Sequence, residues 1–210
     1  MNLFINREMP KDKDGSYKDK KLITPLKPNF RLTAIRQVYV NDKLIEAPQF
    51  HENDGSMAVL MQILVFCNDR TSRDRKEERS TGNLLLDFAA RKGFHKKLFE
   101  TIVPRITLYR LKTRPWITSA LIKLNDNYRL ITQDEPERLL DQCNKILLKG
   151  KPAGIPPNMS KQILGLYQGM AAEHSQVIAL EYKDIEKSTI EFQNIFQSAN
   201  FTLVGMIGLN

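Results

Sequence analysis

The sequence lacks the short motifs by which many enzymes are identified. It contains no GxxxxGKS or GxxxxGKT loop and no GxGxxG loop after a predicted strand, so both common nucleotide-binding loops are absent. It also has no HExxH, no CxxC pair and no Gly-x-Ser-x-Gly elbow. These absences favour a protein with no enzymatic activity, no cofactor, no metal site and no small-molecule substrate.

Cysteine and long apolar runs are also scarce. The two cysteines, Cys67 and Cys143, lie in separate segments, and we expect them to be reduced, small core residues. The longest apolar run, residues 57–67, has the length of a core helix and is too short to span a bilayer. The N-terminus has no apolar signal region, and Asn2 excludes N-myristoylation. The sequence therefore predicts an intracellular protein of the cytoplasm, nucleoid or nucleus, neither secreted nor membrane-spanning.

The hydrophobic pattern predicts an α+β fold with a mixed or antiparallel sheet and about five to six helices. Period-two patterns and β-branched residues indicate strands at residues 30–40, 43–47, 105–113, 117–124, 128–132, 176–182 and 201–209. Helical spacing indicates helices at residues 57–67, 84–92, 95–103, 134–150, 160–174 and from 188 onward. We expect a single domain at residues 30–210, preceded by a flexible basic arm at residues 1–29.

Several helix ends have recognisable signals. Ser56 is a candidate N-cap for the helix at 57–67, and Thr81 or Asn83 for the helix at 84–92. Asp134 and Gly150 are expected to begin and end one long helix. Ser188 with Glu191 forms a capping box. The helix at 95–103 is expected to bury an apolar face made of Leu98, Phe99, Ile102 and Val103.

Positive charge is concentrated between residues 91 and 129. This segment has ten Lys and Arg residues against Glu100 and Asp126, so its charge of +8 equals the formal net charge of the whole chain. Aromatic residues are interleaved with these cations. Such a pattern suits a polyanion, because cations displace phosphate counterions and rings stack on bases.

The leading hypothesis from this pattern is a non-enzymatic nucleic-acid-binding protein that reads the phosphate backbone, with RNA favoured over DNA. The residues expected to make the contacts are Arg91, Lys92, Lys96, Lys97, Arg105, Tyr109, Arg110, Lys112, Arg114 and Trp116.

Three alternatives remain open at this point. One is a self-associating, matrix-like structural protein that bridges an anionic membrane surface and a nucleoprotein. Another is a metal-dependent enzyme that acts on nucleic acid and assembles its site from residues distant in sequence. The last is an ordinary solvated face on a protein with another role.

Overall fold

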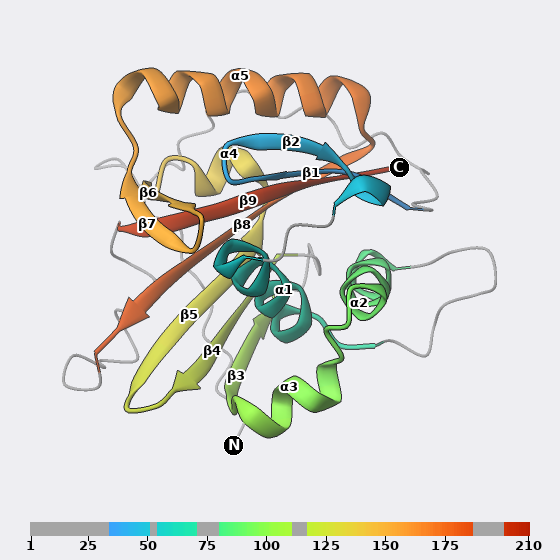
Figure 1. Cartoon of the computed structure of the whole chain (residues 1–210), viewed down its shortest axis with the longest axis vertical. Coiled ribbons are helices and arrows are strands. Elements are labelled where there is room, and N and C mark those ends of the chain that lie inside the picture. The colour runs from blue at the N-terminus through green and yellow to red at the C-terminus, as the bar shows by residue number, and fades with distance from the viewer. Residues whose placement is uncertain (1–33, 51–53, 71–79, 111–116, 187–199) are drawn as a thin grey trace, which may run out of the picture.

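The structure is a computed structural model that describes residues 34–50, 54–70, 80–110, 117–186 and 200–210. The helices of this part are η1 (Ala47–Gln49), α1 (Gly55–Cys67), α2 (Thr81–Arg91), α3 (Lys96–Ile102), α4 (Pro136–Leu139) and α5 (Pro157–Glu173). Its strands are β1 (Ile35–Val40), β2 (Lys43–Glu46), β3 (Arg105–Arg110), β4 (Thr118–Leu124), β5 (Asn127–Asp134), β6 (Cys143–Leu148), β7 (Lys151–Gly154), β8 (Gln176–Ile185) and β9 (Phe201–Leu209). Figure 1 shows their arrangement.

All nine of these strands belong to one mixed sheet. Its main path runs β2-β1-β9-β8-β5-β4-β3, and every pair along that path is antiparallel. β6 pairs in parallel with the first residues of β9, and β7 forms an antiparallel hairpin with β6. β9 therefore has three neighbours, and all nine of its residues are buried. These observations confirm the predicted α+β class.

Helices α1, α2 and α3 cover one face of the sheet (Figure 1). α1 is apolar almost all round, and nine of its residues are buried, which suits a helix enclosed between the sheet and its neighbours. α4 and α5 pack on the opposite face, where α5 contributes Ile163, Tyr167 and Met170 to a second core cluster. The sheet is thus covered on both sides.

Most predicted elements are confirmed. The hairpin at residues 35–46 forms around Asn41 and Asp42, the predicted strands between residues 105 and 132 correspond to β3, β4 and β5, and β9 occupies residues 201–209. The N-cap of α1 is Asp54, whose side chain accepts from the amides of Ser56 and Met57, so the prediction of Ser56 was wrong. α2 is capped by Ser80.

The prediction of one helix at 134–150 was wrong. Only α4 is helical there: Asp134 ends β5, a turn at residues 140–142 follows α4, and strand β6 then leads through a second turn to β7. β6 is central in its part of the sheet, and Ile146 and Leu147 are buried in different core clusters. A strand that is apolar on both faces lacks the alternation that distinguishes it from a helix.

The predicted apolar face of the helix at 95–103 was half wrong. Phe99 and Val103 pack against the core, and the Phe99 ring contacts the Phe66 and Phe94 rings. Leu98 and Ile102 are 55% and 70% exposed. The arm at 1–29, the helix predicted from residue 188 and most of the charged loop at 68–83 lie outside the described residues.

Candidate functional site

The predicted basic face divides into three groups in the structure. Arg91 and Lys97 are exposed, whereas Lys92, Lys96 and Arg105 are half-buried and bond to the protein itself. Arg110 and Tyr109 lie near the end of β3. Lys112, Arg114 and Trp116 lie outside the described residues.

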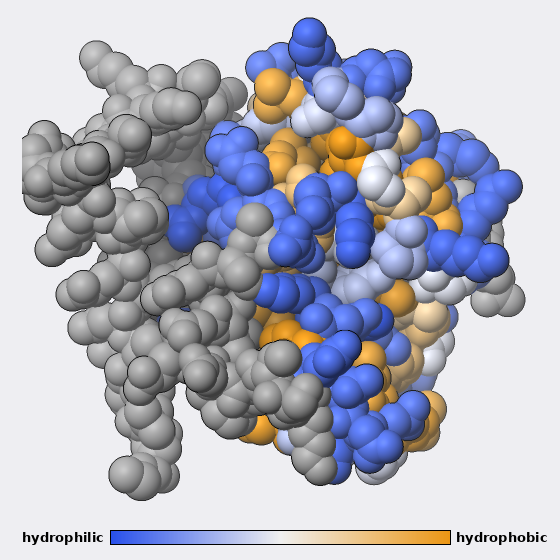
Figure 2. Space-filling view, turned by 90° about the vertical axis from the view of Figure 1, so that its left-hand side faces the viewer, coloured by the Kyte–Doolittle hydropathy of each residue, from blue (hydrophilic) through white to orange (hydrophobic). Residues whose placement is uncertain are grey.

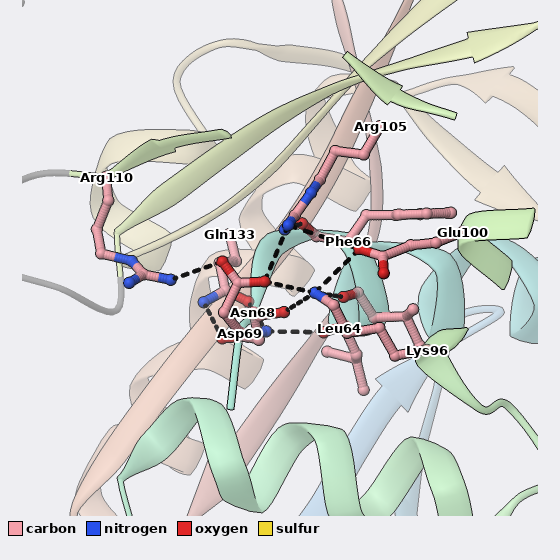
Figure 3. A network of polar contacts seen from close by, with 10 residues as sticks. Leu64, Phe66, Asn68, Asp69, Lys96, Glu100, Arg105, Arg110 and Gln133 are labelled. Atoms are coloured by element: carbon pink, nitrogen blue, oxygen red, sulfur yellow. Dashed lines mark hydrogen bonds and ion pairs between the residues drawn. The ribbon is translucent and has the colours of Figure 1, made fainter. Parts of the chain in front are cut away.

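Lys96 and Arg105 bind the C-terminal end of α1 (Figure 3). The Lys96 ammonium donates to the carbonyl of Val65 at 3.3 Å and also to that of Asn68. The Arg105 guanidinium donates to the carbonyl of Phe66 at 2.9 Å. The last carbonyls of a helix have no partner within the helix and carry partial negative charge, so cations stabilise this end.

Asp69 joins the same two cations just after α1. Its Oδ1 atom lies 2.7 Å from the Lys96 ammonium and 2.9 Å from Arg105, and its Oδ2 atom lies 3.8 Å from Arg110. Glu100 also lies within 3.5 Å of Lys96 and Arg105. Behind them the buried amides of Asn68 and Gln133 exchange hydrogen bonds of 2.8 and 3.1 Å (Figure 3). This cluster fixes α1 against α3, β3 and β5.

Lys92 has a similar internal role. Its ammonium donates to the carbonyl of Phe50 and lies 5.8 Å and 5.9 Å from the ring centroids of Phe50 and Phe88. Three of the predicted phosphate-binding cations therefore already bind carbonyl groups of this chain.

The carboxyl group of Asp69 gives this cluster a pH dependence. Burial alone would raise the pKa of Asp69, but the hydrogen bonds and charges of Lys96 and Arg105 lower it below the usual 3.8. Because the folded-state pKa is the lower one, the stabilisation is present at neutral pH and is lost as the pH falls through that pKa. We expect Asp69→Asn to lower the free energy of unfolding at pH 7 by about 1 kcal/mol, a figure reduced for solvent screening of a side chain that is 38% exposed.

Urea unfolding at pH 7 and at pH 3 tests this expectation, with the exposed Asp141→Asn as the control. The deficit of Asp69→Asn should shrink at pH 3, and Asp141→Asn should match the original protein at both values. An equal deficit at both pH values would show that Asp69 acts through packing alone.

A second group of polar contacts lies at the tip of the β6–β7 hairpin. The hairpin turns through two residues, Lys149 and Gly150, which both have positive φ angles of 49° and 78°. Such turns favour Asn or Gly at the first position. A lysine in the left-handed region is uncommon and costs about 1–2 kcal/mol.

The β1–β2 turn and the start of α1 hold this turn in place. The Lys149 amide donates to Asn41 Oδ1 at 2.8 Å, and the Gly150 amide donates to Ser56 Oγ at 2.8 Å. The backbones of Gly55 and Gly150 approach so closely that a Cβ built on Gly55 would lie 2.9 Å from the Cα of Gly150. We call Asn41, Asp54, Gly55, Ser56, Lys149 and Gly150 the turn cluster.

The turn cluster brings together the β1–β2 turn, the start of α1 and the β6–β7 turn. Lys149 is exposed, as are Lys43 and Lys151 beside the two turns. Figure 2 views the side of the molecule that carries the β6–β7 hairpin, where the described residues are mostly hydrophilic, with smaller hydrophobic areas between them. An exposed ammonium beside a helix N-terminus favours an anionic group.

Sequence reasoning missed this cluster because it treated residues 134–150 as one helix, which gave Lys149 a helical position. The available signal was a two-residue turn ending in Gly150, placed between two short segments able to form strands.

Two comparisons with known proteins indicate the same family. A family model described as "P-type ATPase, cytoplasmic domain N" matches residues 56–210, which is 155 of the 210 residues. "Calcium-transporting ATPase 1" of Bacillus cereus is 20% identical over 176 residues, which cover 83% of this chain and 20% of that protein. The chain therefore spans about a fifth of the length of this curated relative.

These findings overturn the prediction of an RNA- or DNA-binding protein, and with it the matrix-like and nucleic-acid-processing alternatives. The predicted partners, namely nucleic acid, a second copy and an anionic membrane, are wrong for the same reason. The matched family also speaks against the expectation of no small-molecule substrate. The physical reason lies in the cations: an excess of Lys and Arg does not distinguish residues that bind carbonyls within the protein from residues that face a polyanion.

The predicted location is supported only in part. No helix in the described ranges is long and apolar enough to cross a membrane. The matched family is that of a cytoplasmic domain, which supports neither a nucleoid nor a nuclear location.

Proposed function

Because the chain belongs to the family of P-type ATPase cytoplasmic domain N, we propose that it binds ATP on behalf of a cation-transporting ATPase. The curated relative is named for calcium transport, and calcium is accordingly the cation that we propose. We propose ATP as the substrate of the ATPase reaction. We place this binding step on the cytoplasmic side of the membrane, and we retain residues 30–210 as a proposed single domain.

The main support for the nucleotide-binding proposal is the unfavourable backbone conformation of the exposed Lys149. Its left-handed backbone is unfavourable for a lysine, and the turn persists because Asn41 and Ser56 bond to it from two other segments. The β1–β2 turn has the same two-residue form but uses Asn41 and Asp42, which tolerate positive φ well. A strained, exposed lysine where asparagine would be more stable indicates a functional side chain.

The charge and position of Lys149 suit a nucleoside triphosphate. Its ammonium provides three donors for phosphate oxygens. The neighbouring residues Lys43 and Lys151 add positive charge around the turn, whereas the carboxylate of Asp54 is occupied by Asn41 and by the first amides of α1. The turn cluster therefore offers cations to an anionic ligand while its carboxylate is bound internally.

Isothermal titration calorimetry of the 210-residue chain with ATP, and separately with a short single-stranded RNA, tests this proposal. We expect ATP to bind with a Kd between about 1 µM and 1 mM, the range common for enzyme substrates, and RNA of equal phosphate concentration to bind more weakly. Tight RNA binding with no heat of ATP binding would overturn the proposal.

A further inference from the structure

We propose that Asn41 is a positioning residue for Lys149, so that the β1–β2 turn determines how well the β6–β7 turn binds nucleotide. This inference rests on the proposed function and deepens it. Asn41 lies outside residues 56–210, which the family model matches, so the contact belongs to a segment that the match does not cover.

Asn41 uses both ends of its side-chain amide. Its Oδ1 atom accepts from the Lys149 backbone amide at 2.8 Å, across 108 residues of sequence. Its Nδ2 atom donates to Asp54 Oδ2 at 2.7 Å, and Asp54 Oδ1 in turn accepts from the amides of Ser56 and Met57 at 2.9 and 3.1 Å. Asn41 thus connects the strained lysine directly to the capped first turn of α1.

The position requires an asparagine for two separate reasons. A carboxamide carries its donor and its acceptor on two separate atoms, which lets Asn41 bond to Asp54 and to Lys149 at once. An aspartate there would place a second carboxylate against Asp54. Asn41 itself has a φ angle of 55°, a conformation that asparagine tolerates better than most residues. The next residue of the turn is fixed as well, because the Tyr39 hydroxyl donates to Asp42 Oδ1 at 2.9 Å.

The Asn41 contact fixes the backbone from which the Lys149 side chain extends. Lysine has a long flexible stem, so its ammonium reaches a defined position only if the backbone that carries it is fixed. Asn41 holds the Lys149 amide, and Ser56 holds the Gly150 amide from the start of α1. Loss of the Asn41 contact would leave the turn tied to α1 through Ser56 alone, so that the Lys149 backbone is fixed less firmly, which weakens binding without removing the cation.

A double-mutant cycle on ATP affinity tests this inference. The variants are Asn41→Gly, which keeps the positive φ and removes both hydrogen bonds, Lys149→Ala, and the two combined. We expect Asn41→Gly to raise the Kd for ATP about fivefold or more, and to add nothing further once Lys149 is alanine, because its effect acts through that lysine.

Asn125→Gly is the matched control, since Asn125 is an asparagine with a φ angle of 53° in the β4–β5 turn. It should leave the affinity unchanged. If Asn41→Gly lowers the ATP affinity equally in the original protein and in Lys149→Ala, the inference is overturned. The same holds if Asn41→Gly binds ATP normally while Lys149→Ala binds it more weakly. Normal ATP binding by Lys149→Ala would overturn the proposed Lys149 site as well, so the two failures are distinguishable.

Discussion

Gly205→Ala is expected to prevent folding or to lower the free energy of unfolding by about 4 kcal/mol or more. A Cβ built on Gly205 lies 2.1 Å from the backbone oxygen of Tyr39, far inside any real carbon–oxygen contact. The obstacle is backbone of β1, which pairs with β9 at this point and cannot rotate away as a side chain could. Since a domain of this kind is stable by about 5–15 kcal/mol, such a loss is a large part of the total.

Urea unfolding and the yield of soluble protein measure this effect, with Gly165→Ala as the matched control. A Cβ on Gly165 meets nothing within 4 Å, and Gly165 is an exposed residue of α5. That substitution should therefore stabilise the protein, by up to about 1 kcal/mol, through helix propensity. A Gly205→Ala protein that unfolds at the same urea concentration as the original would contradict the close packing of β1 on β9.

Lys149→Asn is expected to change stability and ATP affinity in opposite directions. Asparagine suits the left-handed first position of this turn, so the free energy of unfolding should rise by about 0.5–1 kcal/mol. Loss of the ammonium removes a charged donor worth about 1.5–3 kcal/mol, so the Kd for ATP should rise about tenfold or more. Higher stability with lower affinity is the pattern expected where strain is retained for function.

Urea unfolding and calorimetric titration with ATP give the two quantities for the same preparation. Lys151→Asn is the control, because Lys151 is an exposed lysine two residues away in β7, outside the strained turn. We expect its ATP affinity to change much less than that of Lys149→Asn. If Lys149→Asn is stabilised and still binds ATP normally, Lys149 is merely a poor turn residue.

Regular elements with clear boundaries could be predicted from the sequence. The β1–β2 hairpin has alternating residues and an Asn41–Asp42 turn, and β3, β4 and β5 are separated by turn-forming residues. α1 is a continuous apolar segment of helical length. In each case the local pattern and the tertiary environment favour the same structure.

The segment at 134–150 could not be resolved in this way. Leu139, Ile146 and Leu147 have spacing that fits one face of a helix, yet Ile146 and Leu147 are buried on opposite sides of the sheet. Which reading is correct depends on β9, a strand more than fifty residues later in the sequence with which β6 pairs. Local periodicity contains no information on that partner.

The site was missed for a related reason. The turn cluster combines residues 41, 54–56 and 149–150, which only the folded sheet brings together. Charge density pointed instead to residues 91–129, where Lys96 and Arg105 bind the carbonyl end of α1. A count of charges gives the number of cations but not the direction in which each side chain points.

The central claim is that this chain binds nucleotide at the turn cluster. Titration of the isotopically labelled chain with ATP, followed by NMR of the backbone amides, tests it most directly. We predict that the largest shifts occur at Lys149, Gly150 and Ser56, with small changes at Lys96 and Arg105. Shifts confined to the neighbourhood of Asp69 would contradict the account, and so would an absence of shifts at ATP concentrations well above about 1 mM, the upper end of the usual substrate range.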